Sequence, residues 1–99
     1  MAQVPVRVSF AMTAAQRFML HDGQMVPLDA GGSGVIQVEE NEADLILFGI
    51  IGTPGNTGTI TLTPPATHRL DIASHPIQIR IAQGKTRAGS SRFFQILQP

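Results

Sequence analysis

The chain contains no cysteine, no tryptophan and no tyrosine. Without cysteine it can form no disulfide, no thiolate metal site and no cysteine nucleophile. Because small secreted domains often depend on disulfides, this absence favours a reducing compartment such as the cytoplasm. Tryptophan and tyrosine are prominent among the hot-spot residues of protein interfaces. Any partner surface is therefore expected to rely on aliphatic contacts, backbone pairing or complementary charge.

Long apolar segments and net charge are also lacking. The longest apolar run, 45–51, is too short to span a bilayer, and residues 1–5 have neither the basic region nor the apolar core of a signal peptide. The formal net charge of +0 provides no overall field toward nucleic acid or membranes. A chain of 99 residues with 42% hydrophobic and 14% charged residues predicts one soluble globular domain, residues 1–99.

Alternation of apolar and polar residues is the dominant pattern, and it predicts half-buried strands. Residues 59–63 and 77–81 alternate in this way. Because Pro5 cannot donate a hydrogen bond to a neighbouring strand, we expect the first strand to start at the edge of a sheet. That strand, residues 4–12, has the clearest alternation, with the apolar set Val4, Val6, Val8, Phe10 and Met12.

Residues 13–21 fit two patterns. Residues 13–16 match a capping box, which would begin a short helix. Asp22 and Gly23, in contrast, form a hairpin turn signal with a strand expected on each side. We favour strand–turn–strand and expect at most one short helix near residues 13–20.

The apolar run 45–51 has hydrophobic side chains on both faces of a strand. Such a strand must be covered on both sides, or it becomes an aggregation hazard. We therefore place it at the centre of the sheets, with Gly49 allowing a close approach or a bulge. Turn-forming residues separate seven to nine short strands in total. This spacing predicts an all-β fold, an antiparallel sandwich of immunoglobulin-like or jelly-roll-like type, or a small barrel.

One group of residues has the side chains used in acid–base, nucleophilic and metal chemistry: His68, Asp71, Ser74 and His75. Residues three apart on a strand face opposite sides, so His68 and Asp71 diverge unless a turn intervenes. No nucleophile elbow and no zinc-binding helix motif surrounds them. We predict no catalytic residue, no metal and no cofactor. The alternative is a small-ligand- or metal-binding β-barrel with its site around His68, Asp71 and His75.

An acidic turn and a glycine-rich turn are two further candidate sites. The acidic turn could offer oxygens to calcium, but the ordered ligand pattern of a calcium loop is missing. We interpret it as a solvated turn whose charges protect the neighbouring apolar run. The glycines of the segment 52–58 precede a threonine-rich strand and not a helix, which indicates a tight turn and not a phosphate site. The acidic turn contains Glu39, Glu40, Glu42 and Asp44.

A basic loop, 85–92, precedes two adjacent phenylalanines, Phe93 and Phe94. Basic groups beside aromatic rings can bind single-stranded nucleic acid. Three charges on a neutral chain form a thin patch, and we expect both phenylalanines to serve the core, so nucleic acid is not predicted as a partner. Residues 83–91 are predicted to form a polar loop, followed by a final strand over 92–97.

The charges divide unevenly along the chain. Residues 1–50 contain two arginines and six carboxylates, whereas residues 51–99 contain five lysines or arginines and one carboxylate. Such asymmetry can mark an interaction surface, unless the fold brings the two halves together to neutralise each other.

We predict a non-enzymatic structural or protein-interaction module that binds a protein partner or forms a homo-oligomer. It would suit a larger assembly such as a virion or an appendage, and neither nucleic acid nor a membrane is expected as a partner. The predicted partner-binding residues are Glu39, Glu40, Glu42, Asp44, Lys85, Arg87 and Arg92.

Overall fold

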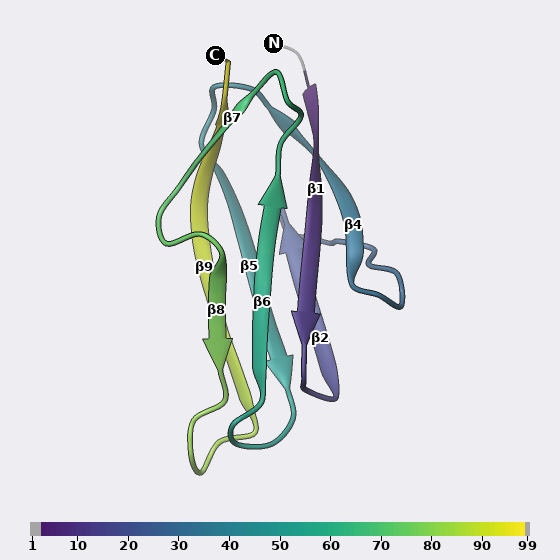
Figure 1. Cartoon of the computed structure of the whole chain (residues 1–99), viewed down its shortest axis with the longest axis vertical. Coiled ribbons are helices and arrows are strands. Elements are labelled where there is room, and N and C mark those ends of the chain that lie inside the picture. The colour runs from purple at the N-terminus through teal and green to yellow at the C-terminus, as the bar shows by residue number, and fades with distance from the viewer. Residues whose placement is uncertain (1–2, 99) are drawn as a thin grey trace.

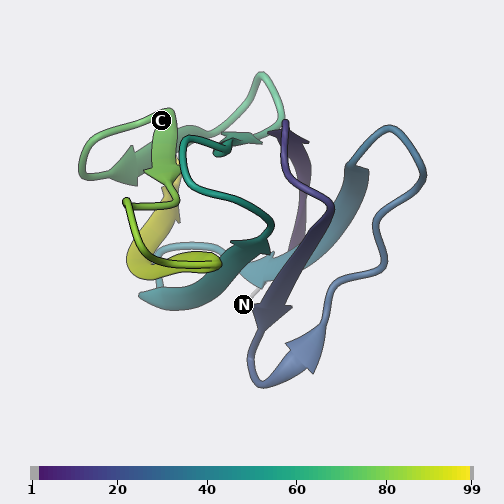
Figure 2. The same cartoon turned by 90° about the horizontal axis from the view of Figure 1, so that it is seen from below.

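Two antiparallel sheets pack face to face in the computed structural model (Figures 1 and 2). The structure describes residues 3–98, and Met1, Ala2 and Pro99 of the predicted 1–99 domain lie outside this range. The first sheet has the strand order β4-β1-β6-β8, and the second has the order β3-β2-β5-β9-β7. The predicted all-β sandwich is therefore confirmed. The strands are β1 (Gln3–Met12), β2 (Gln16–His21), β3 (Gln24–Met25), β4 (Ser33–Glu39), β5 (Asp44–Ile51), β6 (Thr57–Thr63), β7 (Arg69–Ile72), β8 (Ile77–Arg80) and β9 (Arg87–Leu97).

The core lies between the sheets and follows from the alternation seen in the sequence. In β1, every second residue from Val4 to Phe10 is buried, and the residues between them are exposed. Because successive strand side chains point to opposite faces, one apolar series lines the interior from a single strand. Strands β2, β5 and β9 of the second sheet supply the facing side chains, and β6 adds to the side of β1. Over residues 3–98 no helix is long and apolar enough to cross a membrane.

Strand β1 lies inside the first sheet and is not an edge strand, but its residues 3–6 pair with β4 alone, so the strand starts at an edge as expected. It lies between β4 and β6, and Pro5 is opposite Gln37 of β4, whereas the ladder with β6 begins only at Arg7. Backbone groups of alternate residues point to opposite neighbours, and Phe10 N donates to Gly32 O on the β4 side. The ring nitrogen of Pro5 therefore points to the side where β6 has already ended, and no ladder bond is lost.

Strand β5 is the middle strand of the second sheet, as predicted, but it is not covered on both sides. The side chains of Ile46, Phe48 and Ile50 point inward and are at most 1% exposed. On the opposite face, Leu47 and Ile51 are each 41% exposed. The sandwich has two layers only, so the outer face of its central apolar strand remains at the surface.

Residues 13–25 form strand–turn–strand, which confirms the favoured pattern and excludes a helix over this segment. Asp22 and Gly23 have φ angles of 52° and 75°, as a tight hairpin turn requires. Strand β3 is only two residues long. The predicted loop 83–91 is wrong in its second half, because β9 begins at Arg87 and pairs with β5 from there onward.

Candidate interaction surface

The outer face of the second sheet carries a continuous apolar strip across four strands. Strand register places Met25 beside Leu20, and Leu20 beside Leu47. Leu45 lies opposite Phe93 on β9. Four of the five exposed large hydrophobic residues belong to this face, with exposed fractions of 65% for Met25, 41% for Leu47, 41% for Ile51 and 70% for Phe93. No other face of residues 3–98 has more than one exposed large hydrophobic side chain.

Gly49 keeps the centre of this face flat. A methyl group at this position would lie 2.4 Å from Cζ of Phe18, so glycine allows the Phe18 ring to lie across β5. The predicted close approach at Gly49 is confirmed, and register continues through it on both sides without a bulge. Because Phe18 and Leu20 are half-buried, they join the more exposed side chains into one surface.

The acidic turn contains two structural residues. Glu40 accepts a hydrogen bond from Nε2 of Gln98 at 3.1 Å, and its other oxygen lies 2.9 Å from Nε2 of His68. Asn41 N donates to Ile96 O at 2.8 Å. These contacts tie the turn to the end of β9 and to the β6–β7 loop. Glu40 therefore has a role inside the chain, and it is a poor choice for testing a partner contact.

The remaining acidic residues of the turn have different surroundings. Asp44 lies 2.7 Å from Nε2 of His21, and both side chains are less than 15% exposed. Glu39 is half-buried at the end of β4, opposite Gln3. Glu42 is exposed, and within residues 3–98 its carboxylate has no hydrogen-bond or ion-pair partner. Of the four predicted acidic residues, Glu42 is the one whose charge faces solvent at the tip of the turn.

The basic residues do not meet the acidic turn within the chain. Figure 1 shows the β4–β5 turn at one end of the long axis and the β8–β9 turn at the other, and Lys85 belongs to the β8–β9 turn. The molecule extends 44 Å along this axis. Among residues 3–98 every ion pair involves a histidine, and no lysine or arginine contacts a carboxylate. The two charged halves therefore do not neutralise each other by direct pairing.

Arg87 and Arg92 differ from Lys85 because both lie in β9. Arg87 is exposed and lies beside Ile51 on the outer face of the second sheet. Arg92 is half-buried, and its guanidinium donates to the Ser90 hydroxyl and the Ser91 carbonyl at 2.8 Å each. Arg92 is therefore not part of a basic loop, and the basic end of the molecule has Lys85 and Arg87 at its tip.

The alternative site around His68, Asp71 and His75 does not assemble. Nε2 of His75 accepts a hydrogen bond from Leu62 N at 2.9 Å. His68 contacts the acidic turn, whereas Asp71 lies exposed on β7 opposite Gln95. Each histidine has a structural contact of its own, and no shared cavity joins the three side chains among the described residues.

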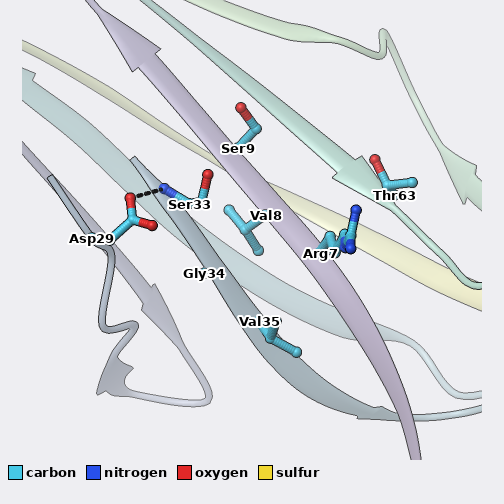
Figure 3. Close-up of a pocket in the computed structure, with 8 residues that line it drawn as sticks. All are labelled: Arg7, Val8, Ser9, Asp29, Ser33, Gly34, Val35 and Thr63. Atoms are coloured by element: carbon cyan, nitrogen blue, oxygen red, sulfur yellow. Dashed lines mark hydrogen bonds between the residues drawn. The ribbon is translucent and has the colours of Figure 1, made fainter. Parts of the chain in front are cut away.

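A hollow of about 500 Å³ lies on the first sheet, and Figure 3 shows its lining. The side chains are spread over β1, β4 and β6 and do not converge on one point. Asp29 is already engaged, because its carboxylate accepts a hydrogen bond from Ser33 N at 3.0 Å. The hollow therefore has no donor set that would define a ligand. Its lining residues are Arg7, Val8, Ser9, Asp29, Ser33, Gly34, Val35 and Thr63.

Sequence reasoning missed the exposed face although its signals were present. The run 45–51 is apolar on both faces, but we interpreted the second face as covered. In Phe93 and Phe94, the period of two allows only one side chain to point inward: Phe94 is 2% exposed and Phe93 is 70% exposed. The expectation that both rings serve the core is therefore wrong.

Comparison of the chain with protein-family models, curated proteins and solved structures finds no match.

Proposed function

We propose that the chain is a non-enzymatic assembly module that forms a dimer through the outer face of the second sheet. The observation that supports this function is the strip formed by Met25, Leu47, Ile51 and Phe93 on one face. Monomeric proteins rarely expose large apolar patches, and patches of several hundred Å² commonly mark interaction sites. A central strand that is apolar on both faces needs a cover that the chain does not supply.

The area of the face is adequate for a second copy. From the exposed fractions, the four side chains present about 400 Å² of apolar surface on each copy. Two copies would bury about 800 Å² in their apolar centre, and polar side chains at the rim would bring the total to the roughly 1,200–2,000 Å² of a stable interface. The aromatic Phe93 provides the largest part, and it adds an aromatic contact to the aliphatic, backbone or charge contacts expected from the sequence.

The charges favour one orientation of the two copies. In a face-to-face dimer, a two-fold axis along the strands would place like-charged ends together. An axis in the interface plane and perpendicular to the strands places the Glu42 end of each copy near the Lys85 end of the other. The second arrangement pairs opposite charges twice and closes the assembly, because the same patch is used on both copies.

Sedimentation equilibrium of the full chain tests the dimer. We expect a reversible monomer–dimer equilibrium in the micromolar range or tighter, and no higher species. The substitution Phe93→Ser removes about 150 Å² of apolar contact from each copy, so we expect the dissociation constant to rise at least 100-fold. Because Phe93 is 70% exposed in the monomer, its replacement lowers the free energy of unfolding by only about 1 kcal/mol.

Val35→Ser is the matched control. Val35 is 52% exposed and lies on a strand, but its side chain is on the first sheet, opposite Arg7. We expect this variant to dimerise like the unsubstituted chain, within twofold in the dissociation constant. A chain that is monomeric at 100 µM, or a dimer that Val35→Ser weakens and Phe93→Ser does not, contradicts the proposal.

A further inference from the structure

Three metal-ligating side chains meet at the open side of the sandwich, between β4 and the β2–β3 hairpin. Nε2 of His21 lies 2.7 Å from Oδ2 of Asp44 and 3.8 Å from Oδ2 of Asp22. One ligand atom from each residue lies within 4.8 Å of the other two. The cluster faces away from the outer apolar strip, because His21 pairs with the inward-facing Ile46.

The fold holds each of the three residues from a different position. His21 is the last residue of β2, and its side chain is 12% exposed. Asp44 is the first residue of β5, and its Oδ1 accepts a hydrogen bond from Leu45 N at 2.9 Å, which fixes the orientation of the carboxylate. Asp22 occupies the hairpin turn, and its side chain is 74% exposed. Two ligands are thus fixed and shielded, and the third is free to adjust.

A hydrogen bond explains the short distance between His21 and Asp44. It does not explain why Asp22 also lies beside the imidazole of His21. Asp22 brings a second carboxylate to the same imidazole nitrogen. The oxygens of the two carboxylates lie within 4.8 Å of each other and repel unless a cation lies between them, either the protonated imidazole of His21 or a metal ion. Asp22 and Gln37 also line two adjacent hollows of about 300 and 180 Å³. Glu39 and Glu42 line the smaller hollow, so the surrounding potential is negative.

We propose that His21, Asp22 and Asp44 bind one divalent transition-metal ion of the zinc type. Ligand atoms about 2.1 Å from a metal lie roughly 3.0–3.5 Å from one another at angles of 90–110°. The observed separations bracket this range, so a movement of the exposed Asp22 side chain and a small shift of Asp44 suffice. The metal would replace the proton on Nε2 of His21, which is released to solvent or moved to Nδ1.

The ligand set selects the class of metal. Imidazole nitrogen suits zinc, nickel and copper, whereas calcium needs six to eight oxygens and magnesium prefers carboxylates and water. Only three protein ligands are present, so water from the adjoining hollows completes the coordination. The site does not use the outer strip, because His21 and Asp44 are shielded on the inner side of the second sheet and Asp22 lies in the β2–β3 turn.

Isothermal titration calorimetry and native mass spectrometry of the chain without an affinity tag test the site. We expect one zinc ion per chain, and no binding of calcium or magnesium under the same conditions. Asp22→Asn should weaken zinc binding at least tenfold, because a neutral amide replaces a charged ligand. Asparagine tolerates the positive φ of this turn position, so the substitution leaves the fold intact. Asp44→Asn should also weaken binding.

His68→Gln is the matched control. His68 lies 2.9 Å from Glu40, and its side chain is 15% exposed, so it resembles His21 in contact and burial. It has no second carboxylate, and we expect His68→Gln to bind zinc like the unsubstituted chain. Absence of zinc binding overturns the proposal, and so does binding that Asp22→Asn leaves unchanged or that His68→Gln removes.

Discussion

The orientation of the proposed dimer can be tested by reversing the charges at its ends. Glu42 and Lys85 are both exposed at the tips of their turns. Neither side chain has a hydrogen-bond or ion-pair partner within residues 3–98, so reversal should leave the monomer intact. In the antiparallel arrangement, Glu42→Lys places like charges together at both ends of the dimer. Lys85→Glu also places like charges together, because it puts a carboxylate of one copy near Glu42 of the other.

The magnitude follows from the number of pairs. An exposed ion pair contributes about 0.2–1 kcal/mol, and the two-fold axis produces two such pairs. One reversal converts two attractions into two repulsions of similar size, a total change of about 1–4 kcal/mol. The dissociation constant of the dimer should therefore rise at low salt by a factor between roughly 5 and several hundred. The combined variant should recover part of this loss. Recovery is incomplete because Arg87 keeps its sign beside the altered position.

Sedimentation equilibrium at about 20 mM and 500 mM salt is the assay, since the Debye length falls from about 20 Å to about 4 Å over this range. The difference between variants should vanish at high salt, where charges at the ends are screened. In a parallel dimer position 42 of one copy lies beside position 42 of the other, so Glu42→Lys would replace one like-charged pair by another and leave the dissociation constant nearly unchanged. Dissociation constants within twofold for both single variants would refute an electrostatic choice of orientation.

Two further predictions concern the stability of the monomer, measured by urea unfolding. Gly32→Ala should lower the free energy of unfolding by several kcal/mol, because the new methyl would lie 2.3 Å from a β1 carbonyl oxygen. Gly55 has a similar φ of +91° and open space around it, so Gly55→Ala should lower it by only about 1 kcal/mol. Equal losses of unfolding free energy in the two glycine variants would show that the positive φ alone determines the cost. His75→Ala should cost about 1 kcal/mol, because a β6 amide loses its acceptor, and His75→Gln should retain part of the bond. An unchanged stability of the alanine variant would show that water replaces the imidazole.

The strands of the sandwich were predictable because their side chains alternate. Burial in β1 follows the sequence residue by residue. The position of a strand within a sheet was not predictable in the same way. Pro5 has no amide hydrogen, so it excludes a ladder hydrogen bond at its own position and on one side of the strand. Whether a bond is lost there depends on where the neighbouring strand β6 ends. That end is marked locally by Pro64 and Pro65, which follow Thr63, but the choice of β6 as the neighbour of β1 and the register between them depend on residues far apart in the chain.

The candidate sites were predicted in part, since composition locates charged turns but not their contacts. Glu40 and Asp44 belong to one acidic turn, and the structure gives them histidine partners from two different segments. The third ligand of the proposed metal site, Asp22, was recognised only as a turn residue. His21 attracted no interpretation, because its neighbour Asp44 is 23 residues away in sequence.

A second copy that covers the exposed face of β5 would account for both the apolar outer face and the uneven distribution of charge. An exposed apolar strand face can pair with any similar face. If such a contact joined different patches on the two copies, each added copy would leave a free patch and the assembly could grow without limit. A two-fold axis uses the same patch on both copies, so the assembly closes at two. Apolar contact alone does not choose between the parallel and antiparallel forms of such a dimer. Opposite charges at the two ends of a 44 Å molecule do choose, because only the antiparallel form pairs them.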